Sequence, residues 1–149
     1  MTADAGNETR EHSFTLAEAP IRKRLVLADD DPHVLEMVWR LLYDHYDIVG
    51  RASDGRMLVE QVALHSPDVA VVDLSMPELS GIEATRAITR SAGTVRVVIL
   101  SVHDEPAYVE AAFDAGAHGY VLKLAAEREL IPAIETVIAA GSYLSIGLR

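Results

Sequence analysis

Carboxylates follow two apolar runs of the chain, in a pattern that suggests a binding site for a cation. Leu25–Ala28 runs directly into Asp29 and Asp30, and Val69–Val72 runs into Asp73. If both runs are buried parallel strands, their carboxyl ends lie on one edge of one sheet, where open α/β sheets bind ligands. Two carboxylates about 4 Å apart repel by roughly 4 kcal/mol at an effective dielectric constant near 20. A divalent cation among the oxygens, or protons on them, would relieve that repulsion.

Five short apolar runs, rich in β-branched residues, alternate with segments of helical period. The runs lack the alternation of apolar and polar residues that marks a half-exposed strand, so they predict strands covered on both faces. They are Leu25–Ala28, Ile48–Ala52, Val69–Asp73, Val95–Leu100 and Gly119–Lys123. Five strands alternating with five helices predict an α/β fold with a doubly wound, five-stranded parallel sheet and right-handed crossovers.

Two of the five helices have informative ends. The first begins with Pro32 in its first turn, after Asp31 as a cap. The last has a clear apolar stripe and Gly141 as a stop. Pro132 lies early in this last helix, so either the helix begins near Glu129 or its first turn is distorted. The three helices between them are expected from Gly55 to about Ser66, from Gly81 to Arg90 and from Pro106 to Ala115.

Composition limits the classes of function. The 149 residues are 50% hydrophobic, which is enough for one domain, expected over 21–149 behind a disordered leader at 1–20. With 13 basic against 23 acidic residues the formal charge is −10, which argues against direct nucleic-acid binding by this chain. Cysteine is absent, and no apolar stretch approaches the roughly 20 residues of a membrane span. We therefore expect a cytoplasmic protein without a membrane partner.

The residues at the predicted strand ends resemble the receiver domain of bacterial response regulators in two-component systems. The likeness covers about residues 22–145 and implies the (βα)5 flavodoxin-like receiver fold. It is carried by Asp29-Asp30, by Asp73 within Val-Val-Asp-Leu-Ser-Met-Pro-Glu-Leu-Ser-Gly, by Ser101, and by Tyr120-Val-Leu-Lys123. Leu100–Glu105 and Gly141–Ser145 resemble the NarL/FixJ subfamily, whose receivers usually continue into a helix-turn-helix DNA-binding domain.

The resemblance implies a phosphoacceptor and a metal site. Asp73 is similar to the residue whose carboxylate attacks a phosphoryl group in line and becomes an acyl phosphate. Asp30 would coordinate Mg²⁺ directly together with Asp73, and Asp29 would hold it mainly through water. The backbone carbonyl of Ser75 would complete the protein ligands. Mn²⁺ is the alternative ion, since such sites are built from oxygen ligands.

The resemblance also implies a switch. Lys123 and the Ser101 hydroxyl would contact phosphoryl oxygens, and Tyr120 would enter the space that Ser101 leaves when it turns inward. Phosphorylation would thereby change a protein-binding surface. The implied donor is a histidine kinase or a phosphotransfer protein, and the implied readout is a homodimer or an effector protein. One departure from the family pattern is that Leu124-Ala125-Ala126 follows the lysine, so the turn into the last helix lacks a capping side chain.

The expected function is therefore a phosphorelay switch whose only reactions are self-phosphorylation from a phosphodonor and self-dephosphorylation. A stand-alone receiver is the first interpretation, and the receiver portion of a helix-turn-helix transcriptional regulator without its DNA-binding domain is close behind. A phosphohydrolase of the haloacid-dehalogenase type is disfavoured, because Ser75 stands where such enzymes carry a second aspartate. A pseudo-receiver scaffold is also disfavoured, because it would be expected to have lost an acidic residue or Lys123.

Overall fold

A computed structural model describes residues 21–149, so the leader expected at 1–20 lies outside the described residues. The strands are β1 (Arg24–Ala28), β2 (Asp47–Ala52), β3 (Val69–Asp73), β4 (Arg96–Ser101), β5 (Gly119–Leu122) and β6 (Tyr143–Leu144). The helices are α2 (Pro32–Leu42), α3 (Gly55–His65), α4 (Gly81–Ser91), α5 (Pro106–Asp114) and α6 (Ala126–Ile138). Two short 3₁₀ turns, η1 (Lys123–Ala125) and η2 (Ile146–Leu148), precede α6 and follow β6.

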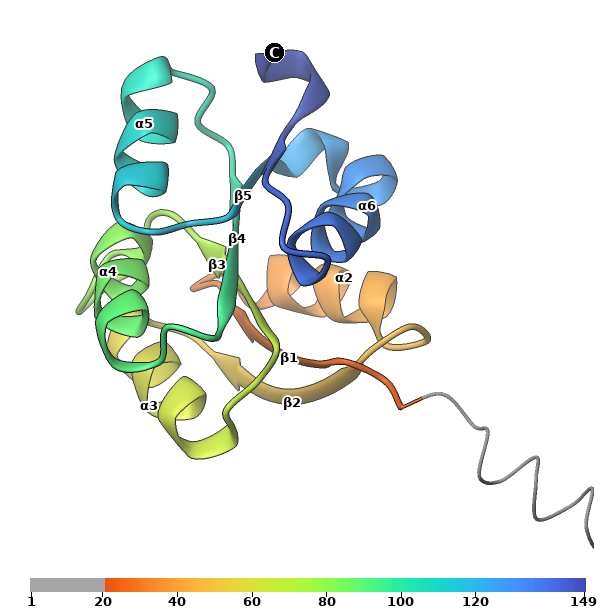
Figure 1. Ribbon diagram of the computed structural model, residues 1–149, viewed down its shortest axis with the longest axis vertical. Helices are drawn as coiled ribbons and strands as arrows, with labels where there is room; N and C mark the ends of the chain where they lie inside the picture. The colour runs from red at the N-terminus through yellow and green to blue at the C-terminus, as the bar shows by residue number, and fades with distance from the viewer. Residues whose placement is uncertain (1–20) are drawn as a thin grey trace, which may run out of the picture.

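All six strands form one parallel sheet in the order β2-β1-β3-β4-β5-β6 (Figure 1). The chain leaves β1 toward β2 on one side and returns to β3 on the other, so the strand order reverses between β1 and β3. This switch point is where open parallel sheets leave a crevice at their carboxyl edge. Asp29 directly follows β1 and Asp73 ends β3, so both carboxylates are placed at that crevice.

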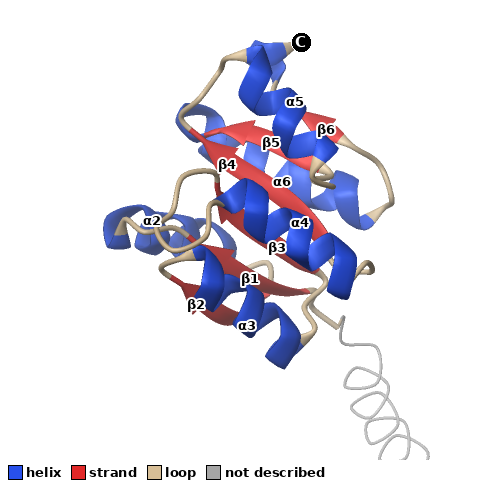
Figure 2. Cartoon of the chain, turned by 90° about the vertical axis from the view of Figure 1, so that its left-hand side faces the viewer, coloured by secondary structure: helices blue, strands red, loops and turns tan. Residues whose placement is uncertain are grey.

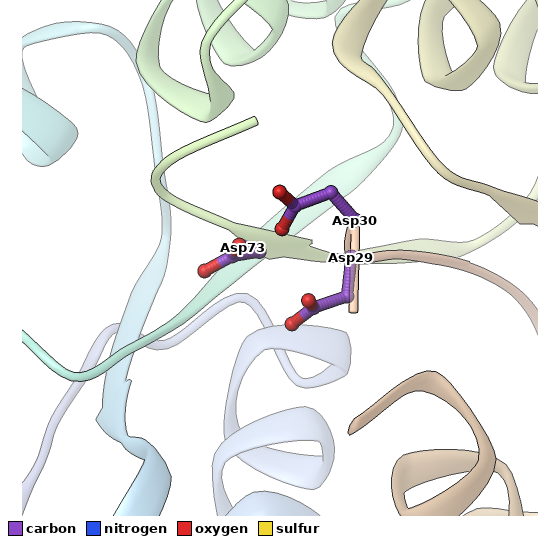
Figure 3. A group of neighbouring side chains, drawn as sticks. All are labelled: Asp29, Asp30 and Asp73. Carbon is purple, nitrogen blue, oxygen red and sulfur yellow. The ribbon is translucent and has the colours of Figure 1, made fainter. Parts of the chain in front are cut away.

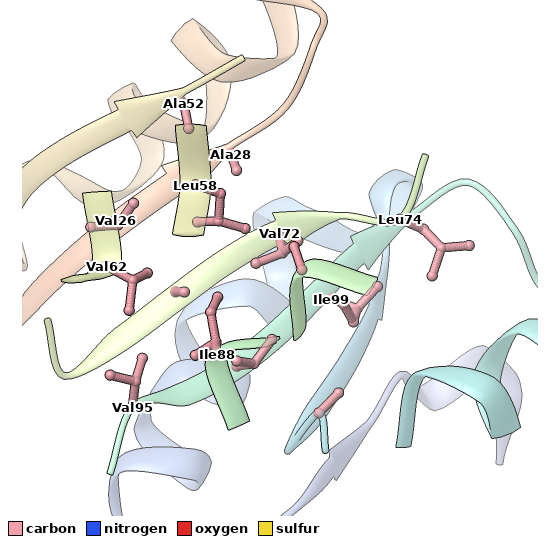
Figure 4. Packing of buried hydrophobic residues seen from close by; sticks show 14 of the residues in the cluster. Val26, Ala28, Ala52, Leu58, Val62, Val72, Leu74, Ile88, Val95 and Ile99 are labelled. Atoms are coloured by element: carbon pink, nitrogen blue, oxygen red, sulfur yellow. The ribbon is translucent and has the colours of Figure 1, made fainter. Parts of the chain in front are cut away.

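Helices cover both faces of the sheet, as its continuous apolar strands require. α3, α4 and α5 cover one face (Figure 2), and α2 and α6 cover the other. On the first face Leu58 and Val62 of α3 and Ile88 of α4 pack on Val26 and Val72 of the central strands (Figure 4). Every residue of β3 is buried, so the strand that carries Asp73 is held from both sides.

The predicted five-stranded doubly wound sheet is confirmed, and β6 is an addition to it. This sixth strand has only two residues, and a run that short carries no readable periodicity. The start of α2 is as predicted, since the Asp31 carboxylate accepts a hydrogen bond from the His33 amide and Pro32 is the first helical residue. None of the described helices is long and apolar enough to cross a membrane.

The last helix does not begin near Glu129, which was one of the two alternatives for its start, and it ends differently from the prediction. It begins at Ala126, three residues before Glu129, and it enters through the 3₁₀ turn η1, so that Pro132 lies in its interior. At the other end Ala140, with φ of +67°, takes the left-handed position that the sequence assigned to a glycine stop. The Gly141 amide instead donates to the carbonyl of Thr136, which closes the helix in a Schellman arrangement.

Gly81 fixes the loop that follows β3, because there is no room for a side chain. A Cβ atom placed on Gly81 would lie 2.0 Å from the backbone oxygen of Asp73. The Gly81 amide also donates to the carbonyl of Leu74 at 2.8 Å, and Ser80 caps α4 by accepting a hydrogen bond from the Glu83 amide. The first turn of α4 therefore packs directly on the backbone of the residue that ends β3.

Gly81→Ala is expected to destabilise the fold by roughly 2 kcal/mol or more, since the neighbouring atoms are backbone and cannot rotate away. Gly93→Ala is the matched control, because a Cβ atom there meets only the Thr89 carbonyl oxygen, at 3.5 Å. Urea unfolding of both variants is the measurement. Equal midpoints for the two variants would contradict the packing argument.

Candidate functional site

Three carboxylates meet at the carboxyl edge of β1 and β3. One oxygen each from Asp29, Asp30 and Asp73 lies within 4.8 Å of the other two. Figure 3 shows the three side chains directed to the same side of the sheet edge. Asp29 and Asp73 are buried, whereas Asp30 is exposed. The cluster that the sequence predicted is therefore present, with one accessible carboxylate above two buried ones.

Both oxygens of Asp29 already have partners in the protein. Its Oδ1 accepts a hydrogen bond from the Asp31 amide at 2.9 Å, and its Oδ2 lies 2.9 Å from Nζ of Lys123. Asp30 is exposed at the mouth of the cluster. This asymmetry between the two neighbouring carboxylates is the one expected if Asp30 binds a cation directly and Asp29 acts through an intervening water.

Lys123 bridges the two buried carboxylates. Its Nζ lies 2.9 Å from Asp29 Oδ2 and 3.1 Å from Asp73 Oδ1, and its side chain is only 17% exposed. Burial lowers the pKa of this ammonium, but the hydrogen bonds and charges of Asp29 and Asp73 outweigh burial and raise the pKa above its ordinary value. Lys123 is therefore a structural cation of the cluster and not a solvated surface charge.

The carboxyl group of Asp73 holds its proton more tightly than an ordinary aspartate. Burial, followed by the negative charge of Asp29, raises its pKa from 3.8 to about 6, although Lys123 acts in the opposite direction. One ammonium thus does not compensate the crowding of three carboxylates. A hard divalent cation bound by oxygen ligands would supply the missing positive charge, and the donor set suits Mg²⁺.

The loop after β3 carries the fourth predicted ligand. Ser75 lies two residues beyond Asp73 and is exposed, while Leu74 and Met76 on either side of it are buried. The loop is also tied to the start of α3, because the Gly55 amide donates to the carbonyl of Pro77. Residue 75 therefore lies in a loop anchored on both sides, two residues beyond Asp73, and the role of its carbonyl as a ligand stays a prediction.

Ser101 and Tyr120 form a compact arrangement with the loop after β4. The Ser101 hydroxyl accepts a hydrogen bond from the His103 amide at 3.0 Å, and the Tyr120 hydroxyl donates to the His103 carbonyl at 2.8 Å. Both side chains are fully buried. In this structure the Tyr120 ring occupies a buried position, and its movement into space left by Ser101 on phosphorylation stays a prediction. The His103 ring stacks on Tyr108, with centroids 4.3 Å apart.

Sequence reasoning missed one buried carboxylate, Glu129 in α6. It is 5% exposed and accepts three hydrogen bonds from the segment around β6. A signal was available, because Glu129 stands four and eight residues before Ala133 and Val137, which are both fully buried. An acidic residue in register with an apolar stripe needs internal partners, and the sequence alone did not reveal them.

The raised pKa of Asp73 predicts that this carboxyl group makes the metal-free protein less stable as the pH rises from about 4 to about 6. Below its unfolded pKa the Asp73 carboxyl group is protonated in both the folded and the unfolded state. Between pH 4 and 6 the unfolded state ionises more readily than the folded state, so the free energy of unfolding falls. Asp73→Asn should therefore stabilise the protein at pH 7.5 by on the order of 2–3 kcal/mol. The gain should shrink at pH 4.5.

Urea unfolding in EDTA at the two pH values measures this difference. Asp44→Asn is the control, since Asp44 is exposed and lies outside the cluster, and its effect should be small at both pH values. A parent protein that is more stable than Asp73→Asn at pH 7.5 would refute the repulsion argument.

Comparison with known proteins places this geometry in a family. A sequence profile described as "Response regulator receiver domain" matches residues 25–135. Transcriptional regulatory protein DegU of Brevibacillus brevis is 36% identical over 123 residues, which are 81% of this chain and 52% of DegU. The chain spans between about half and three fifths of the curated relatives it matches.

Solved structures agree in fold. A two-component response regulator of the LuxR family from Aurantimonas sp. SI85-9A1 superposes with a TM-score of 0.82 at 36% identity, covering 86% of this chain and 93% of that one. The isolated REC domain of RcsB from Salmonella enterica serovar Typhimurium, solved in the presence of phosphomimetic BeF3−, gives 0.79 at 25% identity and covers 86% and 96%. With the matching profile, the carboxylate cluster and the bridging lysine, the chain belongs to the response regulator receiver domain family of two-component systems.

Proposed function

We propose that this chain is a phosphorylation-dependent switch in which Asp73 accepts the phosphoryl group. The observation that carries the proposal is the bridge from Lys123 to Asp29 and Asp73, beside the exposed carboxylate of Asp30. A phosphoryl group arriving at Asp73 would meet a protein cation on one side and a carboxylate pair suited to a divalent cation on the other. Phosphoryl transfer depends mostly on such positioning and charge neutralisation.

In the proposed reaction an oxygen of the Asp73 carboxylate forms a bond to phosphorus, and the bond from phosphorus to the donor breaks. The donor leaves with that electron pair, and the product is an acyl phosphate on Asp73. Mg²⁺, bound by Asp30, Asp73 and the carbonyl of Ser75 and through water by Asp29, would neutralise charge on the transferred group, and Mn²⁺ could replace it. Lys123 would exchange its contact with the carboxylate for one with a phosphoryl oxygen.

The output would pass through Ser101 and Tyr120. The acyl phosphate adds close to two negative charges at the sheet edge. A Ser101 hydroxyl that turns to donate to a phosphoryl oxygen must give up the hydrogen bond from the His103 amide. The Tyr120 hydroxyl is bonded to the carbonyl of the same His103, so the loop after β4 and the ring of Tyr120 would rearrange together. That rearrangement would change the surface offered to a partner.

The proposed donor is a histidine kinase or a phosphotransfer protein, and the proposed readers of the switch are a second copy of the chain or an effector protein. A second reading is the receiver portion of a helix-turn-helix transcriptional regulator. It is favoured by relatives such as DegU, which is named a transcriptional regulatory protein and is longer than this chain. Both readings give this domain the same chemistry.

Asp73→Asn should abolish phosphorylation, because an amide is too poor a nucleophile to form the acyl phosphate. Intact mass after incubation with Mg²⁺ and acetyl phosphate is the measurement. The parent should gain one phosphate, Asp73→Asn should gain none, and Asp30→Ala should be slowed because its metal site is incomplete. Asp44→Asn should behave as the parent. A phosphate that is still added to Asp73→Asn, or that maps to Asp29 or Asp30, would contradict the assignment of Asp73 as the phosphoacceptor.

Lys123→Ala is expected to bind Mg²⁺ but to lose the surface change that follows phosphorylation, because no ammonium then links the phosphoryl group to β5. Self-association of the phosphorylated variant, measured by sedimentation, tests this. Lys23→Ala is the control, since Lys23 is exposed near the amino end of β1, at the opposite edge of the sheet. A normal phosphorylation-driven change in Lys123→Ala would show that its contacts with Asp29 and Asp73 are dispensable.

A further inference from the structure

The short strand β6 ends in a hydrogen bond made by a side chain. The amides of Tyr143 and Ser145 donate to the carbonyls of His118 and Tyr120, at 3.0 and 2.9 Å, as a parallel ladder requires. At the next position along β5 the Leu122 amide donates to the hydroxyl oxygen of Ser145, at 3.3 Å. This last hydrogen bond between β5 and the segment after β6 therefore depends on the orientation of the Ser145 hydroxyl group.

Glu129 fixes that hydroxyl. The Ser145 hydroxyl has one hydrogen, which it donates to Oε1 of Glu129 at 3.0 Å, and this leaves its lone pairs available to the Leu122 amide. The same Oε1 accepts from the Tyr143 hydroxyl at 2.8 Å and from the Ile146 amide at 2.9 Å. Burial raises the pKa of Glu129, but these three hydrogen bonds and the charge of Arg128 together lower it by more, so the carboxylate form is favoured.

The turn that follows Leu122 is held by the burial of Ala125 and Ala126 but by no side-chain cap. Lys123 begins η1, and neither η1 nor α6 has a side-chain cap. Leu124 is fully exposed, so the turn gains no anchor from it. Leu124-Ala125-Ala126, the departure from the family pattern, thus provides no side-chain hydrogen bond to fix the backbone on the carboxyl side of Lys123. The Glu129 network holds it from the amino side.

We propose that Glu129 is a positioning residue for Lys123, acting through the Ser145 hydroxyl and the Leu122 amide. The proposal rests on the proposed function, since it gives Glu129 a part in placing the ammonium beside Asp73. It concerns geometry alone, because Glu129 is not assigned any contact with the phosphoryl group or the metal.

Four variants separate this role from mere stability. Glu129→Ala removes the acceptor, and Ser145→Ala removes the link to Leu122. Glu129→Gln keeps one acceptor oxygen for all three donors and is the conservative rescue. Tyr143→Phe is the matched control, because it deletes one hydrogen bond to the same buried carboxylate but leaves the link through Ser145 intact.

Two readouts are needed, and the first does not depend on phosphorylation. In the unmodified protein, hydrogen exchange at the Leu122 and Lys123 amides should accelerate in Glu129→Ala and Ser145→Ala, and the NMR signal of the Lys123 ammonium should shift. The second is the initial rate of phosphorylation by acetyl phosphate at saturating Mg²⁺. It should fall about tenfold in both variants, since displacements near 1 Å can cost that much or more. Glu129→Gln and Tyr143→Phe should stay within about threefold of the parent.

Equal rates in Ser145→Ala and Tyr143→Phe, or unchanged exchange and Lys123 signals in Glu129→Ala, would overturn the proposal. If Glu129→Ala does not fold, the comparison of Ser145→Ala with Tyr143→Phe still decides it. A parent protein that gains no phosphate would refute the proposed function instead. The exchange and Lys123 measurements would in that case still show whether Glu129 positions the ammonium.

Discussion

The charge balance at the carboxyl edge of β1 and β3 decides which states of this site are stable. Three carboxylates face one ammonium there, so the cluster carries an excess of negative charge when all are ionised. Two of the carboxylates are buried, and the raised pKa of Asp73 shows that Lys123 compensates them only in part. Such a site is costly when empty and favourable for a divalent cation, which is the property a phosphoryl-accepting site needs.

The fold can tolerate the repulsion between these carboxylates because a continuous hydrophobic core supports the strands beneath them. β1 and β3 are central strands packed by helices on both faces, and the loop after β3 is pressed against α4 where Gly81 leaves no gap. This packing limits how far the two buried carboxylates, Asp29 and Asp73, can move apart to relieve their repulsion. Relief must come from a bound cation or from a proton, because an acyl phosphate on Asp73 would add negative charge.

Much of this was predictable from the sequence, for reasons that differ between elements. Continuous apolar runs predicted the strands, the residues at their ends predicted that Asp29, Asp30 and Asp73 share one site, and the resemblance to receiver domains added Lys123. The strand β6 and the start of α6 were not predictable, because a two-residue strand has no period and a 3₁₀ turn without a cap has no marker residue. The partners of Glu129 were also hidden, since they lie 14 to 17 residues away and meet it only through tertiary packing.

If Asp73 is phosphorylated as proposed, these contacts make β5 the element that links the site to the surface. One residue of this strand, Tyr120, is bonded to the loop after β4, and another, Leu122, is bonded to Ser145 beside β6. Lys123 follows directly and holds the carboxylates. A change in the charge that Lys123 faces would therefore act on a strand that a side-chain hydrogen bond links to a neighbouring segment on each side. Breaking either hydrogen bond and forming another costs about 1 kcal/mol, which is small enough for a reversible switch.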